Sequence, residues 1–209
     1  MSAGPQFSSA FGDATGPAVA QVTGHGGGPR ILFVCTANIS RSPYAEMRLR
    51  HLLGPATSWA VASAGVPGTV DQVMDPGMAG LATQRGVHPD ECEAFRSRPV
   101  TGRLLARTAL VVTMEDAHRR RLIDDHPTMV DRIVTLGQLA VGAKALDTRG
   151  PDPTRGAISL VAALDALRTP AVARDDVPDP YRRGARAATR AADLIDASLV
   201  TVAPLLMRV

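Results

Sequence analysis

The sequence predicts an α/β fold, a single doubly wound, four-stranded parallel sheet with helices on both faces. Four short segments are apolar without regular polar alternation, as expected of strands buried on both faces of a parallel sheet. Segments with helical signals lie between them, and an alternation of strands and helices produces a parallel sheet. We predict the strands at residues 31–34, 59–63, 109–113 and 133–135.

Capping signals and apolar periodicity predict the helices. Pro43 suits the first turn of a helix that ends near Leu53. Met78, Leu81 and Ala82 share one face of the next predicted helix. Besides the helix that opens at Ser42 and Pro43, we predict helices at residues 76–85, 115–125, 158–167 and 185–207. Pro204 is expected to kink or shorten the last of these.

The chain has 209 residues, enough for one ordinary domain with a tail. Residues 1–29 contain seven glycines, three prolines and one formally charged side chain, Asp13, and show no apolar period. We predict a disordered tail there. Residues 30–209 are then expected to form the folded domain.

Composition excludes several classes of function. Aromatic residues make up 3% of the chain, which argues against a surface that stacks nucleic-acid bases. The net charge is only +3, and the run Arg119, Arg120 and Arg121 is expected to be a solvated helix face. No apolar run approaches the ~20 residues of a membrane span. We expect a cytoplasmic protein with reduced thiols, no metal, no cofactor, and no nucleic-acid or membrane partner.

The chemistry is predicted in the loop after the first strand, which runs Cys-Thr-Ala-Asn-Ile-Ser-Arg-Ser-Pro from Cys35 to Pro43. Ligands of doubly wound sheets bind at the carboxyl ends of the strands. Amides of a tight turn before a helix N-terminus bind anions and favour a thiolate over a thiol. Arg41 can grip two anion oxygens, Ser42 can donate to the sulfur, and Asn38 tolerates a left-handed backbone.

A lone cysteine at a strand end is most often a small core residue. The Cys-x5-Arg-Ser-Pro spacing reverses that expectation for Cys35, because nucleophile, cationic clamp and helix start lie in one short segment.

This segment resembles the signature of the low-molecular-weight protein tyrosine phosphatases. Further stretches resemble the family in the same order over roughly residues 30–209. They are Trp59 to Gly65, Phe95 to Pro99, Val112 to Glu115, and Asp179-Pro180-Tyr181. The resemblance implies that residues 30–209 are the catalytic domain, with an insert at about 140–175 relative to compact members of the family.

The resemblance implies that Cys35 attacks phosphorus and forms a phosphocysteine. It implies that Arg41 holds the phosphoryl oxygens, and that Asp179 is the general acid and then the base, in preference to the nearby Asp175 and Asp176. The substrate-binding residues it implies are Thr36, Ala37, Asn38, Ile39, Ser40, Ser42 and Tyr181. Trp59 is expected to be structural, and Cys92 has no assigned role.

Four positions depart from the family pattern. Ala37 replaces a usual glycine, and Ser40 replaces a frequent second cysteine, so that no disulfide can protect Cys35. Phe95 replaces a histidine that supports the loop, and Arg182 replaces a second aromatic residue after Tyr181.

The leading functional prediction is a protein-tyrosine phosphatase. The alternatives are a phosphatase of small metabolites such as sugars or nucleotides, suggested by Arg182 and the insert, an arsenate reductase, or an inactive phosphate-binding module. Arsenate reduction requires further thiols, and only Cys92 remains. The sequence leaves the oligomeric state open.

Overall fold

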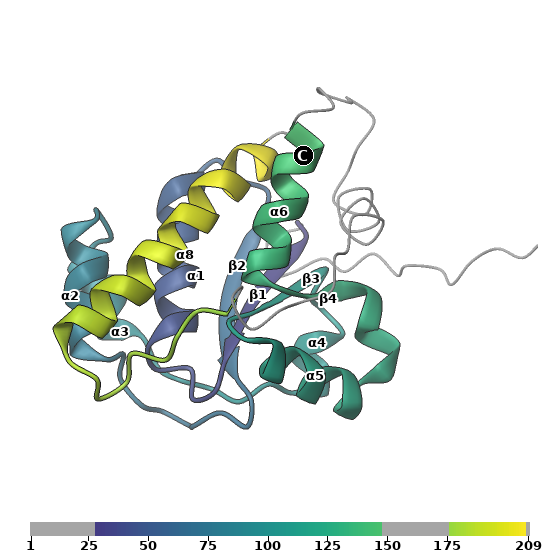
Figure 1. Ribbon diagram of the computed structural model, residues 1–209, viewed down its shortest axis with the longest axis horizontal. Coiled ribbons are helices and arrows are strands. Elements are labelled where there is room, and N and C mark those ends of the chain that lie inside the picture. Colours follow the sequence, from purple (N-terminus) through teal and green to yellow (C-terminus); the bar gives the residue numbers. More distant parts are fainter. Residues whose placement is uncertain (1–27, 148–175, 208–209) are drawn as a thin grey trace, which may run out of the picture.

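The computed structural model describes residues 28–147 and 176–207. Within them a parallel sheet is formed by four strands in the order β2-β1-β3-β4 (Figure 1). The strands are β1 (Arg30–Cys35), β2 (Ala60–Gly65), β3 (Leu110–Thr113) and β4 (Ile133–Thr135). The predicted fold class and all four predicted strands are confirmed, β4 with its predicted bounds and the other three with ends shifted by one or two residues.

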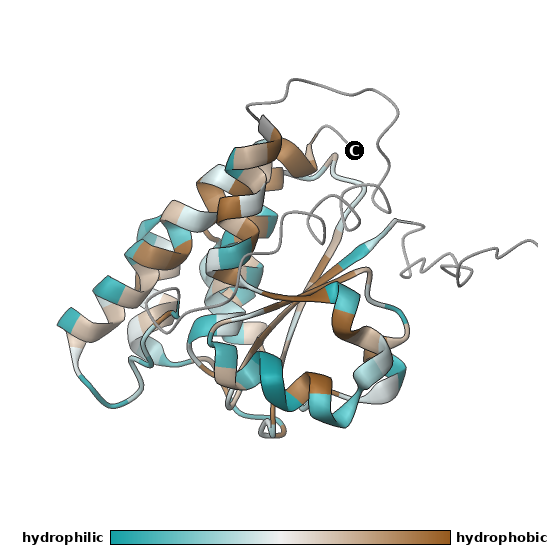
Figure 2. Cartoon of the chain, turned by 45° about the vertical axis from the view of Figure 1, so that its right-hand side comes forward, coloured by the Kyte–Doolittle hydropathy of each residue, from teal (hydrophilic) through white to brown (hydrophobic). Residues whose placement is uncertain are grey.

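The surroundings of β1 explain why its sequence is apolar from Ile31 to Cys35. Ile31, Phe33 and Cys35 pack into one core on one face of the sheet. Leu32 and Val34 pack into a second core on the other face. Side chains alternate between the faces of a strand, so a strand covered on both sides needs apolar residues at every position (Figure 2).

Helices cover both faces, as predicted. The first core is closed by α1 (Arg41–Leu53), α2 (Pro76–Gln84), α6 (Leu136–Asp147) and α8 (Ala185–Leu206). The second core is closed by α4 (Gly102–Leu105), α5 (Asp116–Asp125) and the 3₁₀ turn η1 (Pro127–Arg132) (Figure 1). The helix α3 (Pro89–Ala94) adds Cys92 to the first core.

Four of these elements, α3, α4, α6 and η1, were absent from the sequence prediction. Three of them have six residues or fewer, too short for an apolar period to show. The fourth, α6, contains Gly137 and Gly142, which disfavour a helix in isolation. Burial of Leu139, Ala143 and Leu146 in the first core stabilises it instead. The predicted tail and the predicted 158–167 helix lie outside the described residues.

The long helix α8 continues through Pro204 to Leu206, so the proline does not shorten it. Its buried side chains begin with the small Ala188, Ala191 and Ala192, which allow α8 to approach neighbouring helices closely. The carbonyl of Leu206 accepts a 3.1 Å hydrogen bond from Nε1 of Trp59. Trp59 is buried just before β2, which confirms its expected structural role.

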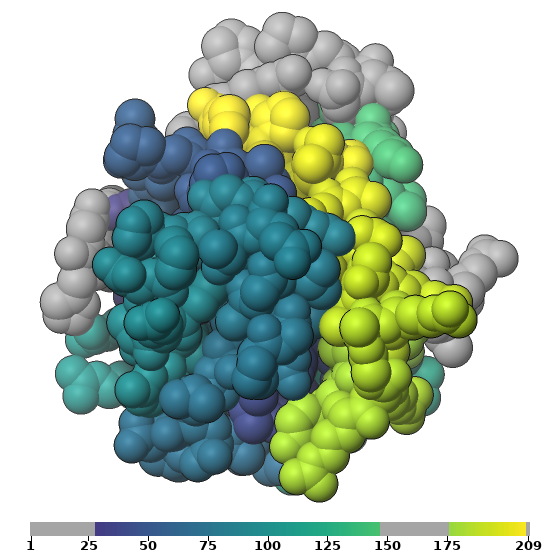
Figure 3. Space-filling view, turned by 90° about the vertical axis from the view of Figure 1, so that its left-hand side faces the viewer, coloured from purple at the N-terminus to yellow at the C-terminus, as the bar shows by residue number. Residues whose placement is uncertain are grey.

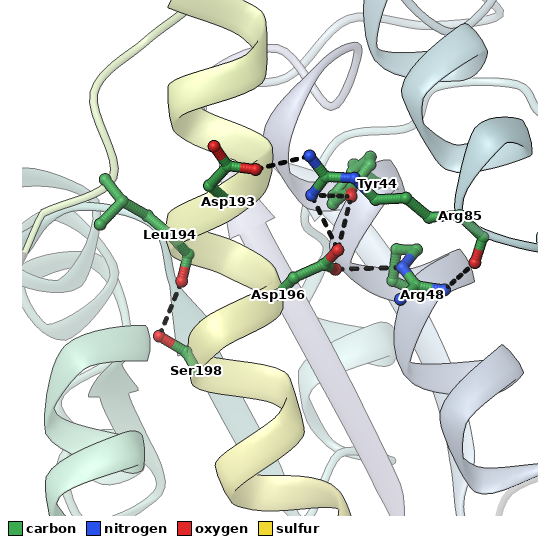
Figure 4. Close-up of polar contacts among 7 residues, drawn as sticks. All are labelled: Tyr44, Arg48, Arg85, Asp193, Leu194, Asp196 and Ser198. Carbon is green, nitrogen blue, oxygen red and sulfur yellow. Dashed lines mark hydrogen bonds and ion pairs between the residues drawn. The ribbon is translucent and has the colours of Figure 1, made fainter.

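A polar network holds α1 against α8 (Figure 4). The carboxylate of Asp196 accepts hydrogen bonds from Tyr44 Oη at 3.1 Å, Arg48 Nε at 3.0 Å and Arg85 Nη1 at 2.8 Å. Arg85 also bonds Asp193 at 2.6 Å. Burial, together with the charge of Asp196, raises the pKa of Tyr44, so its hydroxyl remains a donor. The network thereby fixes the helix that follows the predicted catalytic loop.

Candidate active site

The nucleophile candidate, Cys35, is the last residue of β1 and is buried. Its Sγ lies 3.0 Å from Ser42 Oγ. Asn38 Nδ2 donates to the same oxygen at 3.0 Å, and the Ser42 hydroxyl faces both the sulfur and the Ala64 carbonyl, to which it donates at 3.3 Å. Ser42 therefore lies in contact with Cys35, where its hydroxyl can stabilise a thiolate as the sequence predicted.

Loop carbonyls and loop amides face opposite sides. The carbonyls of Cys35, Thr36 and Ala37 accept hydrogen bonds from the amides of the turn at 66–69, at 2.9, 2.9 and 3.3 Å. In a trans peptide the next N–H points away from the carbonyl. The amides of residues 36–38 therefore point away from this turn, as an anion-binding loop requires.

A close approach makes this packing possible. A Cβ on Gly65, at the end of β2, would lie only 2.7 Å from the Thr36 carbonyl oxygen. Only glycine therefore lets the turn and the loop meet at this distance.

Asn38 has the left-handed backbone that the sequence predicted, with φ of 58°. Its side chain is fully buried and bonds Ser42, Ser63 Oγ at 2.8 Å and the amide of Arg98 at 3.0 Å. Phe95 is thus not needed to hold Asn38. The backbone of Ala37 does not have positive φ, so replacing the usual glycine carries no strain.

Arg41 is the centre of the site and is 1% exposed. Its Nη1 donates to the Glu115 carboxylate and, at 2.8 Å, to the carbonyl of Val177. Its Nη2 lies 3.5 Å from Asp179 Oδ1. Within the described residues, the buried Nε of Arg41 and Oγ of Ser40 have no hydrogen-bond partner. Buried polar atoms are normally paired, so these two are available to an anion.

The loop that carries Asp179 is tied down just before it. Val177 is buried, and its amide donates to the Met114 carbonyl at 2.8 Å. Asp176 accepts a 2.8 Å hydrogen bond from the amide of Asp116, the first residue of α5. Asp176 therefore caps a helix, and Asp179 is the carboxylate that reaches the cavity. Asp175, the other competitor, lies outside the described residues.

One cavity of about 250 Å³ joins these elements. In Figure 3 a dark purple patch, the colour of β1 and the loop after it, lies between the blue segment that follows β2 and the yellow-green segment that leads into α8. The cavity is lined by Cys35, Thr36, Ala37, Ile39, Ser40, Arg41, Thr69, Asp179 and Tyr181. Asn38 and Ser42 are buried behind this wall and support it.

The mouth of the cavity is formed by Tyr181, whose side chain is 44% exposed. The guanidinium of Arg182 lies 5.1 Å from the centre of its ring. Arg182 therefore stacks on Tyr181 at the place where the family often has a second aromatic residue.

A sequence model of the low molecular weight phosphotyrosine protein phosphatases matches residues 30–169. The chain belongs to this family. Wzb of Escherichia coli strain K12, a low molecular weight protein-tyrosine-phosphatase, is 32% identical over 137 residues, 66% of this chain and 86% of its own. EpsP of Ralstonia solanacearum, a probable member, is 34% identical over 109 residues, 52% of this chain and 71% of its own.

Solved structures share the fold. The YwlE arginine phosphatase of Geobacillus stearothermophilus has a TM-score of 0.64 at 23% identity, with 85% of this chain and 92% of that chain covered. Wzb of Vibrio vulnificus has a TM-score of 0.62 at 25% identity, with 86% and 99% covered. The chain is thus a protein-tyrosine phosphatase, a phosphoric monoester hydrolase.

The phosphatase site contains two groups that the sequence analysis did not assign. Glu115 pairs with Arg41, and His118 Nε2 lies 2.9 Å from Thr36 Oγ1. Burial lowers the pKa of His118, and the charge of Arg41 lowers it further, against the opposing effect of Glu115. Both residues follow β3, and the rule that ligands bind at strand carboxyl ends could have pointed to them.

The remaining predictions concern residues away from the cavity. Cys92 is buried, and its Sγ lies 3.6 Å from the sulfur of Met47. Burial raises its pKa, which disfavours the thiolate that arsenate reduction would require. The run from Arg119 to Arg121 lies on α5 and pairs with Asp116 and Asp125, as a solvated helix face does.

No helix among the described residues is long and apolar enough to cross a bilayer. The same residues contain no group of three His, Cys, Asp or Glu side chains that could hold a metal ion.

Proposed function

We propose that this phosphatase hydrolyses phosphotyrosine in proteins through a phosphocysteine on Cys35, with Asp179 as general acid and base. One observation carries the proposal. The sulfur of Cys35, the unpartnered Nε of Arg41 and the carboxylate of Asp179 line one cavity whose loop amides face away from the packed side.

In the first step the Cys35 thiolate attacks phosphorus, a sulfur–phosphorus bond forms, and the bond to the tyrosine oxygen breaks. Ser42 stabilises the thiolate before attack. The loop amides, the N-terminus of α1 and Arg41 stabilise the charge on the phosphoryl oxygens in the transition state. The first turn of α1 contains no acidic residue that would oppose this charge.

Asp179 supplies a proton to the departing phenolate oxygen. Glu115 and Asp179 both lie beside the guanidinium of Arg41, and of the two only Asp179 is among the described residues that line the cavity where the leaving oxygen would lie. In the second step the resulting carboxylate takes a proton from water, which attacks phosphorus, releases phosphate and restores the Cys35 thiolate.

The lining of the cavity supports an aryl substrate. Ile39 and Tyr181 present apolar surface between the loop and the mouth, where a phenyl ring would pass. A sugar phosphate would leave hydroxyl groups against this surface without hydrogen-bond partners. The small-metabolite phosphatase remains the second candidate because Arg182 places a positive charge over Tyr181.

Turnover of p-nitrophenyl phosphate without added metal tests the mechanism. We expect Cys35→Ser to remove essentially all activity and Cys92→Ser, the matched control, to retain it. Activity that survives in Cys35→Ser would refute the nucleophile. A higher kcat/KM for phosphotyrosyl peptides than for sugar and nucleotide phosphates would support the protein substrate, and the reverse order would favour the second candidate.

The mechanism also supports two coarser proposals. It requires Cys35 in the reduced state, which favours the cytoplasm as the site of action. Residues 30–209 would form the catalytic domain, with residues 1–29 as an appended tail.

A further inference from the structure

A second and larger cavity, of about 730 Å³, lies at the free edge of β2, away from the catalytic loop. It extends from the start of β1 and β2 to the last turn of α1, and none of its lining residues lines the catalytic cavity. The charged or titratable side chains around it are Arg30, Arg50, His51, Glu91 and Arg98.

Arg50 and Arg98 donate hydrogen bonds to backbone carbonyls at the free edge of β2. Arg50 donates to the outward carbonyl of Val61 from Nε at 3.3 Å and from Nη2 at 3.0 Å. Arg98 Nε donates to the carbonyl of Ser63 at 2.9 Å. These bonds occupy edge carbonyls that an added strand would need, so they oppose strand addition at β2.

Positive charge remains after this use. Arg50 pairs with Glu46, but no carboxylate among the described residues pairs with Arg30 or Arg98. Arg30 is half-buried at the start of β1, and burial together with the charges of Arg98 and Arg107 lowers its pKa. The guanidinium groups thus repel one another, and among the described residues Glu91 is the only carboxylate that lines the cavity.

We propose that this cavity binds a small anion that carries two or more phosphate groups, with Arg30 and Arg98 as its principal partners. Guanidinium groups match the geometry of phosphate oxygens and bind them in pairs. The two arginines line the cavity from different parts of the chain, Arg30 from β1 and Arg98 from the segment between α3 and α4, so a ligand with two phosphate groups can offer one to each. The volume of the cavity leaves room for such a ligand without displacement of Trp59 or the strand.

Arg30 is the residue to test, because Arg98 has a second role. The backbone amide of Arg98 holds Asn38 in the catalytic loop, and a change there could disturb catalysis. Among the described residues, the Arg30 side chain forms no hydrogen bond or ion pair with the catalytic loop or with β2, so Arg30→Gln should retain turnover of p-nitrophenyl phosphate.

Isothermal titration calorimetry with inorganic tripolyphosphate on the full chain tests the proposal, with orthovanadate present to occupy the catalytic loop. We expect Arg30→Gln to weaken binding about tenfold, the loss of one charged hydrogen-bond partner. The control is Arg190→Gln, which removes an exposed arginine on α8. Arg190 lies 16 residues, about 24 Å along the helix, before Leu206, whose carbonyl bonds Trp59 on the cavity wall, so this variant should bind tripolyphosphate as the wild type does.

A variant of opposite sign keeps the test decisive if Arg30→Gln folds poorly. Glu91→Gln removes the opposing carboxylate and should tighten binding several-fold. The proposal is overturned if tripolyphosphate binds without vanadate but not in its presence, because the anion then occupies the catalytic loop. It is also overturned if neither Arg30→Gln nor Glu91→Gln changes the affinity relative to Arg190→Gln. These outcomes do not depend on whether Cys35 is the nucleophile.

Discussion

Arg41 and Glu115, 74 residues apart in the chain, form an ion pair at the wall of the catalytic cavity. Arg41 is 1% exposed and the Glu115 side chain 28% exposed, so the pair is shielded from solvent on the arginine side. The carboxylate thereby fixes the direction of the guanidinium before any phosphate arrives.

Replacement of Glu115 tests this positioning. Glu115→Ala removes one of the three acceptors of the buried Arg41 guanidinium, besides the Val177 carbonyl and Asp179, and should lower the free energy of unfolding by about 1–3 kcal/mol. We expect kcat/KM to fall by about 10- to 100-fold, and Glu115→Gln, which retains one acceptor oxygen, to fall less. Urea unfolding and steady-state kinetics measure both. Equal loss in the two variants would show that acceptor geometry is not what Glu115 contributes.

Removal of the Ser42 hydroxyl should reduce the reactivity of Cys35. Ser42→Ala deletes the 3.0 Å contact to Sγ and leaves the thiolate with fewer donors. We expect alkylation by iodoacetamide at neutral pH to slow several-fold, with Ser198→Ala, an exposed serine on α8, as the control. Unchanged alkylation in Ser42→Ala would mean that the loop amides alone hold the thiolate.

Replacement of Asp179 should matter most for poor leaving groups. Asp179→Asn cannot donate a proton to the leaving oxygen, and we expect a loss of about 10²- to 10⁴-fold in kcat on phosphotyrosine. p-Nitrophenolate departs with little help, so the loss on that substrate should be smaller. Asp176→Asn is the matched control, because Asp176 caps α5. A loss independent of the leaving group would argue against proton donation.

His118 should make stability depend on pH. Burial lowers its pKa below 6.5 in the folded state, so the unfolded chain binds the proton first as pH falls. The stability associated with neutral His118 is therefore complete above pH 6.5 and is lost as pH falls from there toward the lowered folded value.

Urea unfolding at pH 7.5 and pH 5.5 measures this loss. It should be smaller in His118→Gln than in the wild type. His126→Gln, which alters a histidine at the end of α5, should keep the wild-type difference. The same pH dependence in all three proteins would exclude His118 as its source.

A comparison of Asp196 with Asp193 tests how much the shared acceptor contributes to the stability of the network between α1 and α8. Asp196→Ala leaves Tyr44, Arg48 and Arg85 without their shared acceptor, and we expect a loss of about 2–4 kcal/mol in urea unfolding. Asp193, whose side chain is 62% exposed, binds Arg85 alone, and Asp193→Ala should cost under about 1 kcal/mol. Similar losses would show that the shared acceptor adds nothing.

Local signals explain which parts of the fold and site could be predicted. The β1 strand, Cys35 and Arg41 lie within one short segment, so spacing and apolar content were sufficient. Glu115 and His118 reach the loop over 74 and 82 residues, and beyond their place after β3 no local spacing encodes these contacts. The helix α6 was missed for a similar reason, because its glycines are outweighed only by packing against α8 and the sheet.

The attachment of Val177 and Asp176 has a consequence for how this chain tolerates change. Val177 bonds the Met114 carbonyl and the Arg41 guanidinium, and the Asp176 carboxylate accepts from the amide of Asp116, so the chain is fixed immediately before Asp179. The position of the acid is therefore set by Asp176 and Val177, which anchor the chain just before it. A substitution at Met114 or Asp116 that breaks one of these bonds would displace the acid while Asp179 itself is unchanged.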